Sequence, residues 1–496
     1  MGMIHPDEFF QSPEVMAKYV FGIPYAWIPW EYKLPTPNRS IVWPSLISGL
    51  PYELWKQFGF DANGLAFLLL PRILLLATSF AFDAAIVLLS RRHLHVDPSG
   101  PLFAFSTSHT TWIFLTRPFS NTSESLVLLG SFVILFQLPA TPVRTAVLGV
   151  LLALGTFARF TFILFFLPLG LYLVWDNDRH DQLAAAKKAD LGSRSFFRRL
   201  GGVLLTALIG AAAFLGASAV FILVDTWYFQ GSIPSSLSSW VVAPFNNLVY
   251  NMDSSHLAEH GLHPRTNHWL VNMPLLFGPA VFCLVGRVGS LPIHWLLFTS
   301  VVVPVTFLSL APHQEARFLL PVGFPLFLLI GSAFLHRRWL QIFWLAFNLT
   351  VGIWFGFLQQ GGLLPALLST GGSHQSPLCT LPTSAIDNAS AIVLTGTYMP
   401  PRFALSPKHN LSVEDIRLDD MARVIEVHHS RNFLVIFPEP LAAEINTVWL
   451  KFPSAKRTPI QSCWPFISAE SFPRDVWNTT QWTLHVELIT WKTLGS

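Results

Sequence analysis

Long apolar runs, separated by short loops that carry most of the charge, constrain this chain more than any other feature. Only 12% of its 496 residues are charged and 52% are hydrophobic, whereas soluble domains are roughly 25% charged. Because a run of roughly 20 apolar residues can cross a bilayer as a helix, the sequence predicts an α-helical polytopic membrane protein. Several runs are shorter, and these are expected to tilt, break or enter without crossing. About ten runs are recognised, at 62–90, 101–116, 122–138, 146–158, 160–175, 200–224, 269–286, 292–310, 318–335 and 339–358.

The basic residues between these runs predict the topology. Lysine and arginine concentrate in cytoplasmic loops, and here they occupy every second loop, namely Arg91, Arg92, Arg144, 179–199, Arg287, Arg337 and Arg338. The alternate loops, at 5–14, 117–124, 225–268, 313–317 and beyond 359, are therefore expected to share the opposite, lumenal face. The net charge of +3 is too small for this length to suggest nucleic-acid binding.

The organisation along the chain divides into three parts. Residues 1–60 form a first loop that includes an amphipathic segment, 41–58, expected to lie on the membrane surface as a helix. Residues 61–358 form the multispan membrane domain. Residues 359–496 begin with a linker rich in glycine and serine and continue with short strand patterns at 391–394, 433–437 and 482–489. This part is expected to be a small lumenal domain of mixed α and β structure.

Cysteine and sequon positions add limited constraints. The chain has three cysteines, Cys283, Cys379 and Cys463, without metal-ligand spacing. A disulfide between the latter two and a pair of free thiols are both compatible with the sequence, depending on whether the C-terminal region is lumenal. Candidate glycosylation sites are Asn38, Asn388, Asn410 and Asn478.

The segment 5–14, HPDEFFQSPE, places two adjacent carboxylates ahead of the membrane domain. In an extended loop the side chains of Asp7 and Glu8 diverge, which suits one general base rather than a pair of cooperating carboxylates. The alternative is a polar N-terminal tail with an ordinary helix start, where Ser12 precedes Pro13 at the first helical position.

A second group of polar residues lies at 313–317. Pro312 followed by an apolar run predicts a helix start that places His313 and Arg317 on one face, where a phosphate can bind. The alternative is that Glu315 caps this helix and Arg317 reaches the lipid headgroups. Arg117 and Asp225 either line a sugar or acceptor pocket or anchor helix ends at the membrane interface.

Five motifs in one order make the chain resemble the dolichyl-phosphate-mannose-dependent mannosyltransferases of the GT-C class. They are HPDEFFQSPE at 5–14, TRPFSNT at 116–122, DTWYF at 225–229, HQEARF at 313–318 and TYMPPR at 397–402. The resemblance is strongest to members that add a fourth, α-1,2-linked mannose to the GPI precursor. It implies the GT-C fold, the endoplasmic reticulum membrane, a lumenal active site, dolichyl-phosphate-mannose as donor, a GPI intermediate as acceptor, and inversion at the sugar.

The resemblance also implies residue roles. Asp7 is expected to be the base, Glu8 to position it, and His5 to hydrogen-bond the phosphate or the carboxylates. The leaving phosphate is expected to be bound at His313, Glu315 and Arg317, while Arg117 and Asp225 line the substrate pocket. No cofactor or metal is expected, because a lipid monophosphate leaving group requires no metal bridge and the first loop has no Asp-x-Asp pattern.

Several alternatives stay open at this stage. A related enzyme would act on the third GPI mannose or on the lipid-linked N-glycan precursor. From other classes, a transporter would carry polar sites at the membrane midplane, and a non-catalytic subunit would keep the fold without the chemistry. The family normally carries a membrane helix before the first motif, and its absence from this sequence suggests a truncated gene model or a missing first exon.

Overall fold

The computed structural model describes residues 2–187, 196–252, 261–284, 291–405 and 411–491. The chain divides into two compact units. The first unit comprises Met1–Ile28, Leu46–Ile73 and Thr350–Ser496, and the second comprises Pro29–Ser45 and Leu74–Leu349. The first unit therefore joins the N-terminal motif to the C-terminal region, although hundreds of residues separate them in sequence.

The first unit contains the short helices that carry the N-terminal motif. Pro13 occupies the first turn of α2, and Gly22 ends this helix in the left-handed conformation, with φ of 65°, which glycine adopts without a steric penalty. The hydroxyl of Ser12 contacts Ser48 at 2.6 Å and does not cap α2. The helical elements of this unit are α1 (Asp7–Phe10), α2 (Pro13–Phe21), α4 (Leu50–Gln57), η9 (Trp354–Leu358), α18 (Leu363–Thr370), α19 (Thr383–Asp387), η10 (Arg402–Leu405), η11 (Leu418–Asp420), α20 (Met421–Val427), η12 (Glu439–Leu441), α21 (Ala442–Trp449) and η13 (Thr479–Gln481).

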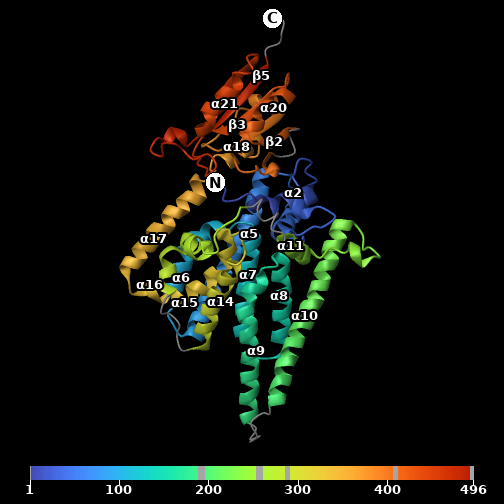
Figure 1. Ribbon diagram of the computed structural model, residues 1–496, viewed down its shortest axis with the longest axis vertical. Coiled ribbons are helices and arrows are strands. Elements are labelled where there is room, and N and C mark those ends of the chain that lie inside the picture. The colour runs from blue at the N-terminus through green and yellow to red at the C-terminus, as the bar shows by residue number, and fades with distance from the viewer. Residues whose placement is uncertain (1, 188–195, 253–260, 285–290, 406–410, 492–496) are drawn as a thin grey trace. The chain divides into compact units, whose positions relative to one another are not determined.

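A five-stranded sheet forms the C-terminal part of the first unit (Figure 1). Its strands are β1 (Ala391–Thr395), β2 (Ser412–Ile416), β3 (Phe433–Pro438), β4 (Ala455–Cys463) and β5 (Leu484–Trp491), in the order β2-β1-β3-β5-β4. β1 pairs in parallel with β2 and β3, whereas β5 runs antiparallel to β3 and β4. The three strands predicted from the sequence are thus confirmed. One face is covered by α20 and α21, whose Ile425, Ile445 and Trp449 pack against the buried side chains of β1 and β3.

The second unit is helical (Figure 1). Its helices α8 (Pro142–Ala158), α9 (Phe162–Lys187) and α10 (Phe196–Gln230) lie side by side. A Cβ added to Gly149 on α8 would stand 2.4 Å from the Gly210 carbonyl oxygen on α10, so the absence of a side chain lets these helices approach closely, as in other membrane proteins. The helical elements are η1 (Trp30–Tyr32), α3 (Val42–Pro44), η3 (Ser90–Leu94), α6 (Ser99–Ser106), η4 (Thr110–Phe114), α7 (Ser120–Gln137), α8 (Pro142–Ala158), α9 (Phe162–Lys187), α10 (Phe196–Gln230), η5 (Leu237–Ser239), α11 (Ala243–Met252), η6 (His268–Asn272), α13 (Met273–Phe277), η7 (Gly278–Leu284), α14 (Pro292–Leu308), η8 (Ala316–Val322), α15 (Gly323–Ile330) and α16 (Ser332–Leu335).

Three further elements, η2 (Ser45–Gly49), α5 (Gly64–Leu89) and α17 (Arg338–Ile353), contribute residues to both units. Among the described residues, three helical stretches are long and apolar enough to cross a membrane, Gly64–Leu94, Phe196–Gln230 and Arg338–Leu358. Several other apolar runs are broken into shorter pieces, such as η6, α13 and η7 in the run at 269–286. The expected helical membrane protein with a small C-terminal α/β domain is confirmed. The segment 41–58 is helical from Val42 to Gln57.

Cys379 and Cys463 form a disulfide within the first unit. This resolves the alternative that the sequence left open in favour of the bonded pair. Cys283 lies in η7, outside this disulfide.

Candidate functional site

The N-terminal motif arranges its three carboxylates differently. Asp7 lies in the first turn of α1, where its backbone N–H donates to Nδ1 of His5 at 3.2 Å and its carboxylate accepts from the Gln11 amide at 2.5 Å. The Asp7 side chain keeps 25% of its surface exposed. Glu8, by contrast, is completely buried and forms an ion pair with Arg72. The two adjacent carboxylates therefore diverge, but they do so in a helical turn and not in the extended loop that the sequence suggested.

Glu14 is the third carboxylate of this motif, and sequence reasoning assigned it no role. It is fully buried, accepts the backbone N–H of Trp27 at 2.8 Å, and accepts that of Phe403 at 3.1 Å. Burial raises the pKa of Glu14 to about 7, and the two N–H groups and the charge of Arg402 oppose this rise. Glu14 thus attaches α2 to the segment that follows the fifth motif.

The fifth motif, 397–402, belongs to the same unit as Glu14. The Arg402 guanidinium lies over the Trp27 ring, 4.6 Å from its centroid, and the Tyr398 hydroxyl accepts from the Gln359 amide at 3.1 Å. The Glu14 carboxylate therefore binds both Trp27 and Phe403, and Arg402, the last residue of the fifth motif, lies over the same Trp27. No local pattern reveals such contacts.

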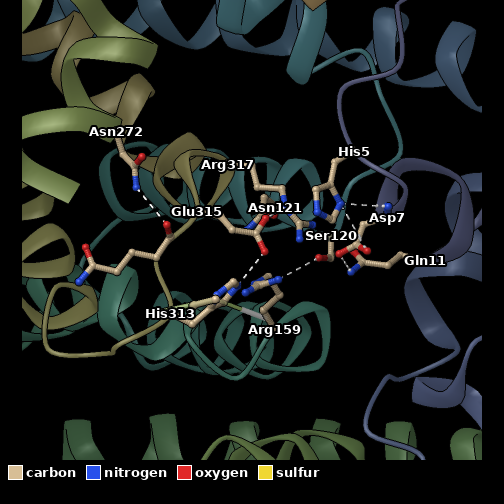
Figure 2. A network of polar contacts seen from close by, with 12 residues as sticks. His5, Asp7, Gln11, Ser120, Asn121, Arg159, Asn272, His313, Glu315 and Arg317 are labelled. Carbon is tan, nitrogen blue, oxygen red and sulfur yellow. Dashed lines mark hydrogen bonds and ion pairs between the residues drawn. The ribbon is translucent and has the colours of Figure 1, made fainter. Parts of the chain in front are cut away.

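A second cluster lies in the second unit, around Glu315. One carboxylate oxygen of Glu315 is 2.8 Å from Nε2 of His313, and the other forms an ion pair with Nε of Arg317 (Figure 2). Nδ1 of His313 is 3.1 Å from the Gly261 carbonyl, so both ring nitrogens face oxygen acceptors. Burial lowers the pKa of His313, but the hydrogen bond and negative charge of Glu315 outweigh it and raise this pKa above its ordinary value.

The prediction that His313 and Arg317 share one helical face is wrong. The helical turn η8 begins only at Ala316, and Glu315 before it has extended backbone angles, φ −106° and ψ 147°. Gln314 accounts for the interruption, because its amide donates to the Ser309 and Ala311 carbonyls at the end of α14. The two cations meet because both bind Glu315.

Aromatic rings support the cations of this cluster. Arg317 is 6% exposed and lies 5.8 Å from the Phe119 ring and 5.5 Å from the Phe318 ring. The Arg159 guanidinium is 4.6 Å from the Phe318 ring, and the His313 ring is 5.7 Å from it. Three basic side chains thus surround Phe318, an arrangement that favours cations on an aromatic face.

Arg159 connects this cluster to the start of α7. Its Nε lies 3.4 Å from the carboxylate of Glu124, and its terminal nitrogen donates to the Ser120 hydroxyl at 3.4 Å (Figure 2). Glu124 is fully buried and also accepts from Asn121 at 2.9 Å and Thr161 at 3.1 Å. Burial lowers the pKa of Arg159 to about 10, so the group stays cationic at neutral pH.

Arg39 approaches the same serine from the first loop. It donates to the Ser120 hydroxyl at 3.4 Å and to Glu31 at 2.9 Å. No motif spacing in the sequence links Arg39 to this cluster. Arg159 carries one local signal, because it stands alone between two apolar runs.

The remaining predicted site residues lie as follows. Arg117 is 6% exposed in the turn before α7, and its carbonyl accepts from Thr122 at 3.0 Å. Asp225, near the end of α10, is fully buried and accepts from the Ser40 hydroxyl and the Ile41 N–H, both at 2.9 Å. These contacts show Asp225 holding the first loop, and its predicted role in substrate binding stays a prediction.

The glycosylation candidates differ in exposure. Asn38 is 5% exposed, and its glycosylation stays a prediction. Asn388 and Asn478 are exposed, whereas Asn410 lies outside the described residues. Within the described part of the chain, no group of three or more His, Cys, Asp and Glu side chains is arranged to hold a metal ion.

The chain is similar to known mannosyltransferases. Residues 1–378 match the Alg9-like mannosyltransferase family. The chain is 35% identical to human GPI alpha-1,2-mannosyltransferase 4, over 82% of this chain and 72% of the relative. It is 32% identical to GPI mannosyltransferase 4 of Aspergillus oryzae, over 83% and 75% respectively.

A solved structure supports the fold. The crystal structure of ArnT from Cupriavidus metallidurans bound to undecaprenyl phosphate superposes with a TM-score of 0.51 at 10% identity, covering 98% of this chain and 94% of ArnT. This likeness confirms the GT-C fold expected from the sequence. Together with the sequence relationship, it shows that the chain belongs to the Alg9-like mannosyltransferase family.

Proposed function

We propose that this membrane-embedded mannosyltransferase of GPI biosynthesis transfers mannose in α-1,2 linkage from dolichyl-phosphate-mannose to the third mannose of a GPI precursor. The names of its relatives support the acceptor and the linkage. The undecaprenyl phosphate bound to ArnT supports a lipid phosphate as the carrier of the donor sugar. The proposed location is the endoplasmic reticulum membrane, with the reaction on its lumenal side.

The proposed reaction is one inverting displacement. The acceptor hydroxyl oxygen bonds to C1 of mannose, while the bond from C1 to the phosphate oxygen breaks. The hydroxyl proton moves to the base, and the electron pair leaves with dolichyl phosphate. This chemistry requires one base and a cationic environment for the departing phosphate.

The observation that carries the assignment of the base is the contrast among the carboxylates of the N-terminal motif. Glu8 and Glu14 are fully buried and bound to Arg72 and to backbone N–H groups, respectively. Asp7 keeps a quarter of its side-chain surface exposed and lies in a loop-helix turn beside His5. We therefore assign proton abstraction to Asp7 and positioning of the loop to Glu8.

The phosphate is assigned to the basic cluster of the second unit. His313, Arg159 and Arg317 face two carboxylates, Glu315 and the Glu124 that pairs with Arg159, so one positive charge is in excess when His313 is protonated, and Phe318 stabilises it. Arginine binds phosphate oxygens through its planar fork of donors. Arg117 and Asp225 are proposed to shape the pocket for sugar or acceptor.

The decisive experiment is in vitro mannosyl transfer with purified protein, dolichyl-phosphate-mannose and defined acceptors. Product with a new α-1,2 mannose on a trimannosyl GPI supports the proposal. Transfer to a dimannosyl GPI or to a lipid-linked oligosaccharide would instead assign the chain to a related reaction. No transfer to any of these acceptors by folded protein would favour a non-catalytic subunit.

A further inference from the structure

The second unit has an apolar groove that the transfer reaction does not use. It encloses about 450 Å³ between α9 and α14 and is lined by side chains such as Leu167, Leu171, Trp295 and Val303. Leu171 is 65% exposed and Trp295 is 55% exposed. In a membrane-embedded chain, hydrocarbon must cover such a surface, because apolar area of this extent is not left in contact with water.

A polar cavity of about 730 Å³ adjoins this groove at Tyr172, which lines both. The cavity carries groups of both signs, among them Arg144, Asp176, His180 and Asp181. Arg144 is 3% exposed and donates to Asp176 at 2.8 Å and to the Leu135 carbonyl at 3.0 Å. Its Nε, however, has no hydrogen-bond partner among the described residues, which leaves a buried cationic donor at the cavity wall.

The junction of groove and cavity coincides with a change of polarity along α9. The helix is apolar from Phe162 to Trp175 and turns polar at Asp176. Trp175 and Trp295 line the groove near this change, and tryptophan is enriched where membrane proteins meet the headgroup layer. The Arg179 guanidinium covers the Trp175 ring at 5.4 Å. Groove and cavity thus match the two halves of a membrane lipid.

This junction lies more than halfway along α9, well away from the basic cluster near the start of the helix. The helix rises about 20 Å from Phe162 to Asp176, and Arg159 lies just before its start. A ligand here would leave the proposed phosphate-binding side chains uncovered. The inference therefore does not depend on the proposed substrate.

We propose that groove and cavity together bind one phospholipid of the surrounding bilayer, with an acyl chain along α9 and α14 and a headgroup beside Arg144. The chemistry favours a headgroup with both a phosphodiester and a primary ammonium. The phosphodiester complements the Arg144 guanidinium, and the ammonium can donate to the carboxylates of Asp176 and Asp181. A headgroup that carries only negative charge would be repelled by these carboxylates, because it has no ammonium group to bind them.

The test counts lipids retained by the purified full chain. Protein is reconstituted in nanodiscs of phosphatidylcholine containing equal fractions of phosphatidylethanolamine and phosphatidylglycerol, then released and analysed by native mass spectrometry. One retained phosphatidylethanolamine, preferred about tenfold over phosphatidylglycerol, is expected, which corresponds to about 1.4 kcal/mol. Equal retention of all three lipids would overturn the proposal.

Two variants locate the lipid. Thr299→Trp fills the groove and should abolish selective retention, whereas Leu208→Trp on the exposed face of α10, 66% exposed, should leave it unchanged. Asp181→Asn should reduce the preference for phosphatidylethanolamine over phosphatidylcholine. Equal retention by the Thr299 and Leu208 variants, at matched thermal stability, would overturn the location.

A competition arm separates phospholipid from the hydrocarbon of the donor. Dolichyl phosphate added in excess should not displace phosphatidylethanolamine. Displacement would show that the groove receives the polyprenyl chain and would reject the phospholipid. Because retention is read without any transfer reaction, failure of the proposed activity would not change this result.

Discussion

The N-terminal motif of the first unit and the basic cluster of the second unit both combine carboxylates with basic side chains. Carboxylates are in excess in the first, and basic groups are in excess in the second. In the first, three carboxylates meet two guanidinium groups, and the buried carboxylates bind Arg72 or backbone N–H groups. In the second, three basic groups, His313, Arg317 and Arg159, face two carboxylates, Glu315 and Glu124. Excess negative charge suits a base, and excess positive charge suits a departing phosphate.

This comparison also shows how burial separates support from chemistry. A buried carboxylate must be paired or hydrogen-bonded, because leaving it uncompensated costs several kcal/mol or shifts its pKa. Glu8 and Glu14 satisfy this requirement by tying the chain together. Asp7 and Glu315 keep part of their surface exposed, which is where a substrate can be reached.

The largest effect is expected for Asp7→Asn. It preserves shape and removes the base, so transfer should fall by about 10²- to 10⁴-fold at unchanged protein abundance. Mannosyl transfer by purified protein measures it. Glu8→Gln is the matched control and should be milder; an inactive Glu8 variant beside an active Asp7 variant would exchange the two roles.

A smaller loss of transfer activity is expected for substitutions of Arg317 in the basic cluster. Arg317→Ala removes a charge-assisted contact of roughly 1.5 to 3 kcal/mol, seen as a higher KM for the donor or slower turnover. Arg317→Lys keeps the charge but loses the planar fork and should also be impaired, with the fold retained. Arg474→Ala, at a side chain that is 74% exposed, is the control. Reduced protein with normal activity per molecule would reject phosphate binding by Arg317.

The pH dependence of donor binding tests His313. Its raised pKa keeps it protonated to higher pH than an ordinary histidine, so its contribution is complete below the ordinary pKa and is lost as pH rises through the folded-state pKa. The KM for the donor should rise by a few-fold across that range. His313→Gln should have a flatter profile, and an identical profile in both proteins would contradict the assignment.

The smallest expected effect is on stability, through Glu14. Its pKa is raised from 4.5 to about 7, so the folded chain holds this proton more tightly than the unfolded chain. Stability from this group is present below pH 4.5 and is lost as pH rises through about 7, by on the order of 3 kcal/mol.

Thermal unfolding in detergent checks this stability effect of Glu14. The Tm of the unaltered chain should fall more steeply between pH 5 and 8, roughly the window of the shift, than that of Glu14→Gln. Parallel slopes would show that Glu14 does not titrate in this range. The absolute Tm of Glu14→Gln is expected to be lower at every pH, because its amide can accept only one of the two backbone N–H groups.

Local sequence patterns were sufficient to predict those features of this protein that depend on neighbouring residues alone. Apolar runs predicted the helical membrane domain, because transfer of side chains from water to hydrocarbon depends on composition over one helix length. Short continuous apolar runs with β-branched residues predicted the strands at Ala391–Thr395 and Phe433–Pro438. Motif order was sufficient to identify the class of glycosyltransferase, and adjacency indicated that Asp7 and Glu8 diverge.

Local sequence patterns did not predict the contacts between segments that are far apart in the chain. Glu14 accepts a hydrogen bond from a residue 389 positions away, Glu8 pairs with Arg72 at a separation of 64, and Arg159 joins Glu124 and Phe318 from three different elements. The helical face expected for His313 and Arg317 failed for a more local reason, since the Gln314 amide donates to the Ser309 and Ala311 carbonyls just after α14. Which partner a buried charge finds depends on how elements pack, because desolvation is compensated only by groups brought within hydrogen-bond reach in the folded chain.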